Sequence, residues 1–197
     1  MHVIRSRDYR RMPWKNGGGE TTEIIVQPTG ASLDDFDWRV SMARVGSSGP
    51  FSAFPSVDRT LCILSGRGID LTIAGRGAVR LDRDAAPLSF PGDVPAGADL
   101  VDGPVEDLNA MTRRGRFRHV LTRVALDRPT QLPRAGEVML VLFRGAGAAL
   151  GAAAAAGAEE IMVEDGDTVV LDVEADVALE IRPNTALDLY VIAITRG

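Results

Sequence analysis

The chain has 197 residues, of which 45% are hydrophobic, and a net charge of −5 at pH 7. Because nucleic-acid binding depends largely on neutralising phosphates, an acidic chain is not expected to bind nucleic acid in general. No apolar run approaches the roughly 18 residues of a membrane helix, and the first residues lack the apolar stretch of a signal peptide. The sequence therefore predicts a cytoplasmic globular protein without nucleic-acid or membrane partners.

The hydrophobic pattern repeats every two residues in short segments separated by turn residues, which is typical of an all-β sandwich or barrel. No long amphipathic helix is evident. Residues 146–158 are rich in alanine but broken by glycines, which favours a weak helical turn or a surface loop. The predicted strands are residues 21–27, 38–45, 59–64, 69–73, 78–81, 116–124, 138–143, 168–173, 177–181 and 187–194.

One pattern occurs twice: a strand, a Gly-x-Gly turn, further strands and a Gly-Asp turn. It covers residues 64–68 with 91–93, and again residues 143–147 with 165–167. The repeat predicts two copies of one small barrel with little helix, and paired barrels with Gly-Asp turns resemble the cupin-like (jelly-roll) barrels of double-domain cupins. We expect the first over residues 1–127, a linker over 128–134 and a smaller second barrel over 135–197. Since the second segment is short for a barrel, we expect N-terminal strands to pair with it.

Histidine and cysteine are scarce in this chain. Metal-binding cupins need two or three histidines and a carboxylate that converge inside the barrel. The only histidines are His2 and His119, and the single cysteine, Cys62, lies in an apolar run. We therefore expect no metal, no cofactor and no catalytic cysteine, and we interpret His119 as a strand residue with a local hydrogen bond.

The densest motif is residues 13–20, which contains the only lysine, Lys15, in a chain with 21 arginines. Asn16 and three glycines follow Lys15. Consecutive glycines permit positive φ angles, so the N–H groups of Gly17 and Gly18 are expected to converge on an anionic or carbonyl oxygen. Lys15 precedes the glycines, unlike the lysine of a nucleotide phosphate loop. The alternative is a flexible or bulged entry to the first strand.

Three further segments carry polar groups in an alternating pattern. In residues 38–43, Arg39 and Ser41 share a face, which either is solvated or lines a barrel interior. Residues 49–61 form a proline and phenylalanine wall before Arg59, whose guanidinium binds a ligand carboxylate or merely pairs with a surface acid. Residues 107–115 form either a ligand-binding face or an edge strand with solvated charges. The side chains on that face are Asp107, Asn109, Met111 and Arg113.

Together these four motifs resemble the HutD/Ves family of the cupin superfamily, in order, over residues 13–115. One departure is Ser56, where the family tends to have glycine. The resemblance implies a bicupin-like protein without the usual metal ligands. Members are often encoded with bacterial histidine-degradation genes, and the resemblance implies that they sense or buffer a pathway intermediate. No established catalytic activity comes with the family.

The leading hypothesis is a small-molecule binding protein for an anionic intermediate of histidine degradation, of the formylglutamate, formiminoglutamate or urocanate class. The alternative is a metal-independent isomerase or hydrolase that uses Lys15 as acid or base. A surface scaffold is a third possibility, and exposed sheet edges make a homodimer plausible. We assign no catalytic residues. The candidate ligand-binding residues are Lys15, Asn16, Gly17, Gly18, Arg39, Ser41, Arg59, Asn109, Met111 and Arg113.

Overall fold

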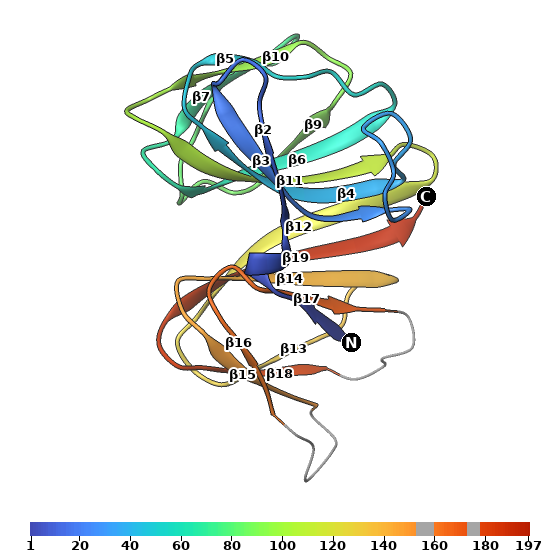
Figure 1. Ribbon diagram of the computed structural model, residues 1–197, viewed down its shortest axis with the longest axis vertical. Helices are drawn as coiled ribbons and strands as arrows, with labels where there is room; N and C mark the ends of the chain where they lie inside the picture. Colours follow the sequence, from blue (N-terminus) through green and yellow to red (C-terminus); the bar gives the residue numbers. More distant parts are fainter. Residues whose placement is uncertain (153–159, 173–177) are drawn as a thin grey trace. The chain divides into compact units, whose positions relative to one another are not determined.

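The computed structural model describes residues 1–152, 160–172 and 178–197 (Figure 1). These residues form antiparallel β-sheets, together with a single short 3-10 helix, η1 (Ser6–Asp8). The all-β fold with little helix predicted from the sequence is therefore confirmed. No helix in the described part of the chain is long and apolar enough to cross a membrane.

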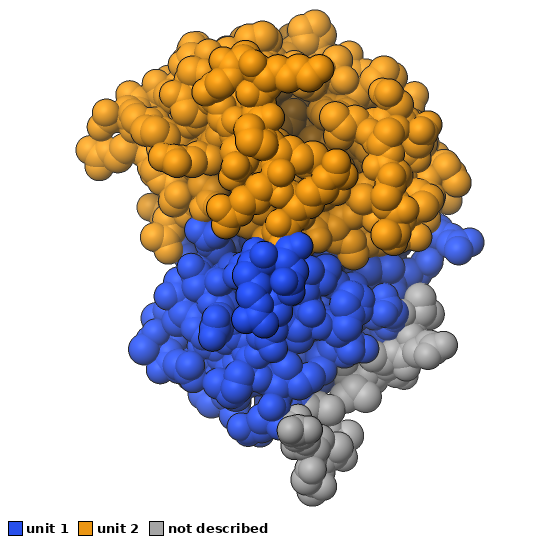
Figure 2. All heavy atoms as spheres, in the orientation of Figure 1, with its two compact units in different colours: residues 1–8, 120–196 blue, residues 9–119, 197 orange. Residues whose placement is uncertain are grey.

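The chain divides into two compact units, coloured separately in Figure 2. Unit 2 contains residues 9–119 and 197, and unit 1 contains residues 1–8 and 120–196. Each unit is built from two sheets, which is consistent with the two-barrel arrangement, and that arrangement stays a prediction. Residues 1–8 and 120–127 group with the C-terminal segment, because their strands hydrogen-bond to strands of that segment.

Unit 2 consists of a six-stranded sheet and a four-stranded sheet. In sheet order, the six strands are β2 (Arg10–Pro13), β3 (Gly19–Gln27), β4 (Trp38–Val45), β11 (Val105–Arg113), β6 (Val57–Ser65) and β9 (Leu88–Pro91). The four strands are β5 (Gly49–Pro50), β10 (Ala96–Leu100), β7 (Ile69–Ile73) and β8 (Gly77–Leu81). Buried aliphatic side chains of both sheets form one core cluster, which includes Leu61 and Ile63 of β6 and Leu71 and Ile73 of β7.

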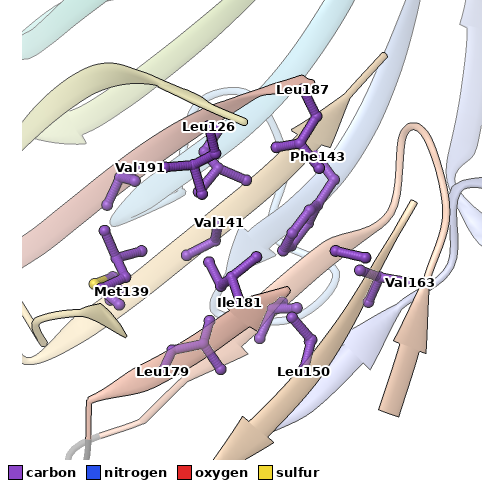
Figure 3. Close-up of a cluster of buried hydrophobic side chains, with 14 of the residues drawn as sticks. Leu126, Met139, Val141, Phe143, Leu150, Val163, Leu179, Ile181, Leu187 and Val191 are labelled. Carbon is purple, nitrogen blue, oxygen red and sulfur yellow. The ribbon is translucent and has the colours of Figure 1, made fainter. Parts of the chain in front are cut away.

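Unit 1 consists of a five-stranded sheet and a four-stranded sheet. The five strands are β1 (His2–Ile4), β17 (Thr168–Leu171), β14 (Val138–Arg144), β19 (Leu187–Arg196) and β12 (Phe117–Leu126). The four strands are β13 (Thr130–Leu132), β18 (Leu179–Pro183), β15 (Ala148–Ala152) and β16 (Ile161–Val163). Figure 3 shows the core between them, where Val141 and Phe143 of β14 lie among side chains such as Leu150 and Ile181.

Each predicted strand overlaps an observed strand, but the sequence analysis did not predict β1, β2, β5, β9, β10, β11, β13, β15 and β16. An edge strand was one of two alternatives for residues 107–115, although they were not in the list of predicted strands. Residues 105–113 form β11 in the middle of the six-stranded sheet, so the edge-strand alternative is wrong. The predicted linker contains β13, which pairs with β18. Residues 148–152 form β15 and neither helix nor loop, while 153–158 of the alanine-rich segment lie outside the described residues, as do positions 173 and 177 of two predicted strands.

Ser56, at the position where the HutD/Ves family tends to have glycine, has a backbone conformation that favours glycine. Its φ is 58°, in the left-handed region that L-residues with a Cβ rarely occupy. Its carbonyl oxygen accepts a hydrogen bond from the Arg114 N–H at 2.8 Å, and its own N–H donates to Asp93 Oδ2 at 3.3 Å. Both bonds use backbone groups of Ser56, so a glycine would keep them.

We expect Ser56→Gly to raise the free energy of unfolding by about 0.5–1 kcal/mol, because the relief of left-handed strain exceeds the entropy that glycine adds to the unfolded chain. Urea denaturation followed by circular dichroism measures the change. Ser56→Ala is the matched control, since it removes the hydroxyl but keeps the Cβ, and it should give no gain. A glycine variant no more stable than the alanine variant would contradict the strain argument.

Candidate functional site

The six-stranded sheet gathers the predicted polar residues on one face. Side chains on directly opposed residues of neighbouring strands point to the same side of a sheet. Arg39, Met111 and Arg59 are opposed on β4, β11 and β6, and Ser41 and Asn109 are opposed two residues further along. Because alternate residues of one strand share a face, these two rows form one surface. The next row on the same face pairs Ala43 with Asp107 and Asp107 with Ile63.

This face lines a cavity of about 670 Å³ within unit 2, and the unit is hollowed on the side that Figure 2 shows. Arg39 and Ser41 therefore line an interior, which decides between the two alternatives that the sequence left open. Of the candidate ligand-binding residues, those in the cavity wall are Lys15, Asn16, Arg39, Ser41, Arg59, Asn109 and Met111. Wall residues that were not among the candidates include Trp14, Thr21, Phe51, Phe54 and Asp107.

Arg59 is the cation most fully built into this wall, with 7% of its surface exposed. Its guanidinium lies 4.5 Å from the ring centre of Phe51 and 5.5 Å from that of Phe90, and its Nε donates to Asn109 Oδ1 at 2.7 Å. Burial lowers the pKa of Arg59 to about 10, against the opposing effect of Asp107, so the group stays charged at neutral pH. Its two terminal amino groups donate to no acceptor among the described residues.

The positive charge of Arg39 is compensated by an ion pair, whereas Arg59 has no ion-pair partner among the described residues. Its Nε lies 2.7 Å from Glu23 Oε2, and both side chains are largely buried, with exposures of 5% and 13%. The Nη1 group of Arg39 also donates to Ser41 Oγ at 3.2 Å. A buried ion pair with good geometry satisfies both charges, so Arg39 and Ser41 shape the wall, and Arg59 is the buried cation of the wall that has no ion-pair partner in the described part of the chain.

Asp107 is a buried carboxyl in the same wall, with 2% of its surface exposed. Its Oδ1 accepts a hydrogen bond of 2.5 Å from Asn109 Nδ2. Burial raises the pKa of Asp107 to about 7, although Arg59 acts in the opposite direction. Arg59 Nε requires a hydrogen-bond acceptor, and Asp107 Oδ1 accepts a hydrogen bond from a donor. The orientation of the Asn109 amide, with Oδ1 toward Arg59 and Nδ2 toward Asp107, is therefore fixed. The three side chains form one hydrogen-bonded chain along the wall.

The glycine-rich motif contributes to the edge of the cavity through residues other than its glycines. Lys15 and Asn16 line the cavity but are exposed, whereas Gly17 and Gly18 do not line it. The Gly17 N–H donates to the Trp14 carbonyl at 3.0 Å, and the Gly18 N–H donates to Asn16 Oδ1 at 3.1 Å. Both N–H groups are thus used within the loop, and the expected anion nest is wrong.

Close packing explains Gly18 and Gly19 of this motif, whereas Gly17 has open space around it and a positive φ of 70°. A Cβ on Gly18 would lie 2.5 Å from Ser47 Oγ, and one on Gly19 would lie 2.4 Å from the Arg44 carbonyl oxygen. The bulged entry to β3 was the alternative considered from the sequence, and the hydrogen bonds within the loop agree with a structural role. The contribution of the motif to the cavity comes from its first residues, Trp14 to Asn16.

The candidate Arg113, and also His119, for which a local hydrogen bond was expected, lie outside the cavity wall. Arg113 donates from Nε to the Phe36 carbonyl at 2.9 Å and from Nη2 to the Asp34 carbonyl at 2.6 Å, so it fixes the loop before β4 and lines a separate hollow of about 340 Å³. His119 hydrogen-bonds through Nδ1 to Thr112 Oγ1 at 2.9 Å and through Nε2 to Thr60 Oγ1 at 2.8 Å.

Burial lowers the pKa of His119 to about 4, so the ring is neutral at pH 7. The interpretation of this residue as a strand histidine with local hydrogen bonds is confirmed. Within residues 1–152, 160–172 and 178–197, no three His, Cys, Asp or Glu side chains gather in a way that would hold a metal ion.

The antiparallel sheets of this chain have a cupin-like fold, as the comparison with solved structures shows. A cupin 2 conserved barrel domain protein from Leptotrichia buccalis matches 98% of this chain and 96% of its own with a TM-score of 0.58 at 11% identity, a likeness of fold alone. The HutD family model matches residues 6–188, so the chain belongs to the HutD family.

Relatives and solved structures agree with this assignment. Protein Ves of Cronobacter sakazakii is 41% identical over 145 residues, covering 71% of this chain and 76% of that protein. An uncharacterized 21.2 kDa protein in the hutC 3′ region of Pseudomonas putida is 38% identical over 119 residues, covering 60% and 61%. The structure of HutD from Pseudomonas fluorescens SBW25 has a TM-score of 0.78 at 29% identity, covering 100% and 98%. A conserved protein of unknown function from Pseudomonas aeruginosa PAO1 reaches a TM-score of 0.88 at 26% identity, covering 98% of both chains.

The residues missed by the sequence analysis differ in how they could have been found. Asp107 was predicted on the same face as Asn109 and Met111 but was left out of the candidate ligand-binding residues, and its burial was not predictable. Phe51 stood in the proline and phenylalanine wall, whereas Phe90 of β9 and Glu23 of β3 carried no local signal. Their roles depend on strand pairings between segments far apart in the chain.

We expect Asn109→Ala to lower the free energy of unfolding by about 1–3 kcal/mol, because it leaves Arg59 Nε and Asp107 Oδ1 buried without their partner. Asn16→Ala is the matched control at an exposed position and should cost about 1 kcal/mol or less. Both values come from chemical denaturation. Equal losses in the two variants would show that the Arg59–Asn109–Asp107 chain contributes nothing particular to stability.

Proposed function

We propose that the cavity of unit 2 binds a small carboxylate intermediate of histidine degradation, of the formylglutamate, formiminoglutamate or urocanate class, and that the protein senses or buffers it. The observation that carries the proposal is the state of Arg59: a buried, charged guanidinium in a cavity wall whose terminal amino groups have no acceptor among the described residues. Such a fork matches the two oxygens of a carboxylate.

The rest of the wall suits a short acid with a polar end. Lys15 at the exposed edge offers a second positive charge to a dicarboxylate whose first carboxylate pairs with Arg59. Phe51, Phe54 and Met111 supply apolar contacts for a carbon chain. A volume of about 670 Å³ lies within the range of about 300–1,000 Å³ that is usual for small-molecule sites.

The choice of pathway draws on the relatives. The HutD family and the Pseudomonas putida protein in the hutC 3′ region carry names that refer to histidine utilization genes. Acids of that pathway combine a carboxylate with a formyl, formimino or imidazole group. A donor such as Lys15 or Asn16 at the exposed edge fits the acceptor atoms of these groups.

We expect N-formyl-L-glutamate, formiminoglutamate or urocanate, at 100 times its Kd, to add about 2.7 kcal/mol of stability and to raise the thermal midpoint by roughly 5–10 °C. Differential scanning fluorimetry measures the shift. Arg59→Lys keeps a charge but loses the fork, so the shift should fall sharply. Arg80→Ala is the matched control, because Arg80 is an exposed arginine that pairs with Asp70. The proposal fails if none of these acids shifts the midpoint of the unmodified protein.

A second candidate is a metal-independent isomerase or hydrolase acting on such an acid, and Asp107 is the observation that favours it. A buried carboxyl whose pKa lies at about 7 can serve as a general acid or base near neutral pH. Lys15, the acid or base expected from the sequence, is exposed and fits this role less well.

The enzyme candidate predicts turnover of one of the three acids, followed by nuclear magnetic resonance, that Asp107→Asn abolishes while binding persists. Asp99→Asn, an exposed aspartate on β10, is the control and should leave turnover unchanged. Binding without any product after prolonged incubation would exclude the enzyme and favour the binding protein.

A further inference from the structure

Asp107 has an oxygen that the protein leaves unused. Its Oδ1 accepts from Asn109 Nδ2, and its Oδ2 has no hydrogen-bond partner among the described residues. In that part of the chain, the one side-chain polar atom that is sealed from solvent and has no hydrogen bond is Asp37 Oδ1, which forms an ion pair with Arg116. The Oδ2 atom of Asp107 is therefore not sealed, and since Asp107 lines the cavity, this oxygen is open to the cavity.

Asn109 holds Asp107 and Arg59 in one array. Its amide oxygen accepts from Arg59 Nε and its amide nitrogen donates to Asp107 Oδ1, so the two ends of the array cannot rotate independently. The terminal amino groups of Arg59 and the Oδ2 of Asp107 thereby line one cavity as a fixed pair of sites. The first can only donate hydrogen bonds, and the second donates only when it carries a proton.

On the basis of the proposed function, we propose that Asp107 enters the complex as a neutral carboxylic acid, so that binding of an anion at Arg59 takes up one proton. Its Oδ2–H then donates to an acceptor atom of the ligand, and Asp107 becomes the residue that selects an acid with a carbonyl or imine acceptor besides its carboxylate.

The charges around Asp107 give this proposal its direction. They are Glu106 beside it on β11, Arg59 on β6, Arg39 on β4 with its partner Glu23 on β3, and Lys15 at the exposed edge. Arg39 is neutralised by Glu23, and Glu106 disfavours ionisation of Asp107. Arg59 is thus the buried charge that favours the carboxylate form of Asp107.

The burial effect on Asp107 comes from its apolar surroundings. Its cross-strand neighbours on β4 and β6 are Ala43 and Ile63, and the core cluster on this side of the sheet is formed by uncharged side chains of the facing strands. The pKa of Asp107 is raised to about 7 before any ligand arrives.

A ligand carboxylate at Arg59 would cancel the positive charge that opposes this rise and add a negative charge nearby. Both effects raise the pKa of Asp107 further and favour its protonated form. Above pH 7 the free site is mostly ionised, so the ligand and a proton must bind together.

The experiment is isothermal titration calorimetry of N-formyl-L-glutamate at several pH values between 6 and 8.5, each in two buffers of different ionisation enthalpy. Both carboxyl groups of this probe stay ionised over that range, so a proton taken up belongs to the protein. We expect uptake of about 0.5 proton at pH 7 and about 0.9 at pH 8, and an affinity that falls about tenfold per pH unit above pH 7.

The matched variants are Asp107→Asn, which keeps the shape and has an amide donor, and Asp99→Asn, an exposed aspartate on β10. Asp107→Asn should bind without proton uptake and with an affinity that is independent of pH, whereas Asp99→Asn should behave as the unmodified protein. Should Asp107→Asn fail to fold, the proton count of the unmodified protein still decides.

The possible results separate this inference from the proposed function. Binding of the probe without proton uptake at pH 8 overturns the role of Asp107 and leaves the binding function standing. Proton uptake that persists in Asp107→Asn also overturns it. If neither N-formyl-L-glutamate nor the two other acids bind at any pH, both the proposed function and this inference fall.

Discussion

The inner face of the six-stranded sheet carries two arginines into the interior of unit 2, and the arrangement of the site follows from how their charges are compensated. Removing a guanidinium from water costs several kcal/mol unless partners replace the lost hydration. Arg39 has a carboxylate partner in Glu23. Arg59 has two aromatic rings, one amide oxygen and a carboxyl that is itself difficult to ionise. The wall therefore retains an excess of positive character at Arg59, and this is the physical basis on which we propose an anionic ligand.

Asn109 is the residue that makes the wall a single unit. The Asn109 amide accepts one hydrogen bond through its oxygen and donates another through its nitrogen. In a protein interior, hydrogen bonds that are linked in this way strengthen one another. The position of Arg59 and the protonation of Asp107 are linked through Asn109. In the proposed complex, a ligand that changes the electrostatic field at Arg59 would change the protonation of Asp107, without any movement of the backbone.

Local patterns predicted much of this. Alternation in residues 38–43 and 107–113 placed the correct side chains on common faces, and the scarcity of histidine led to the interpretation of His119 as a strand residue with a local hydrogen bond. The anion nest of Gly17 and Gly18 failed because the same N–H groups close the loop on Trp14 and Asn16. The prediction that Arg113 binds the ligand failed because this residue lies on β11 beyond the cavity. There its guanidinium donates hydrogen bonds to loop carbonyls.

The amino-acid sequence by itself determined the all-β class, about half of the strands and which residues share a face, because the period of two is a property of each strand alone. Only the tertiary structure decided that β11 is central, that the polar face of β4 is an interior, and that Glu23 neutralises Arg39 while Arg59 stays open. The physical reason is that charge compensation and burial depend on strand pairing between segments remote in the chain. No local pattern encodes which partner a buried charge will meet.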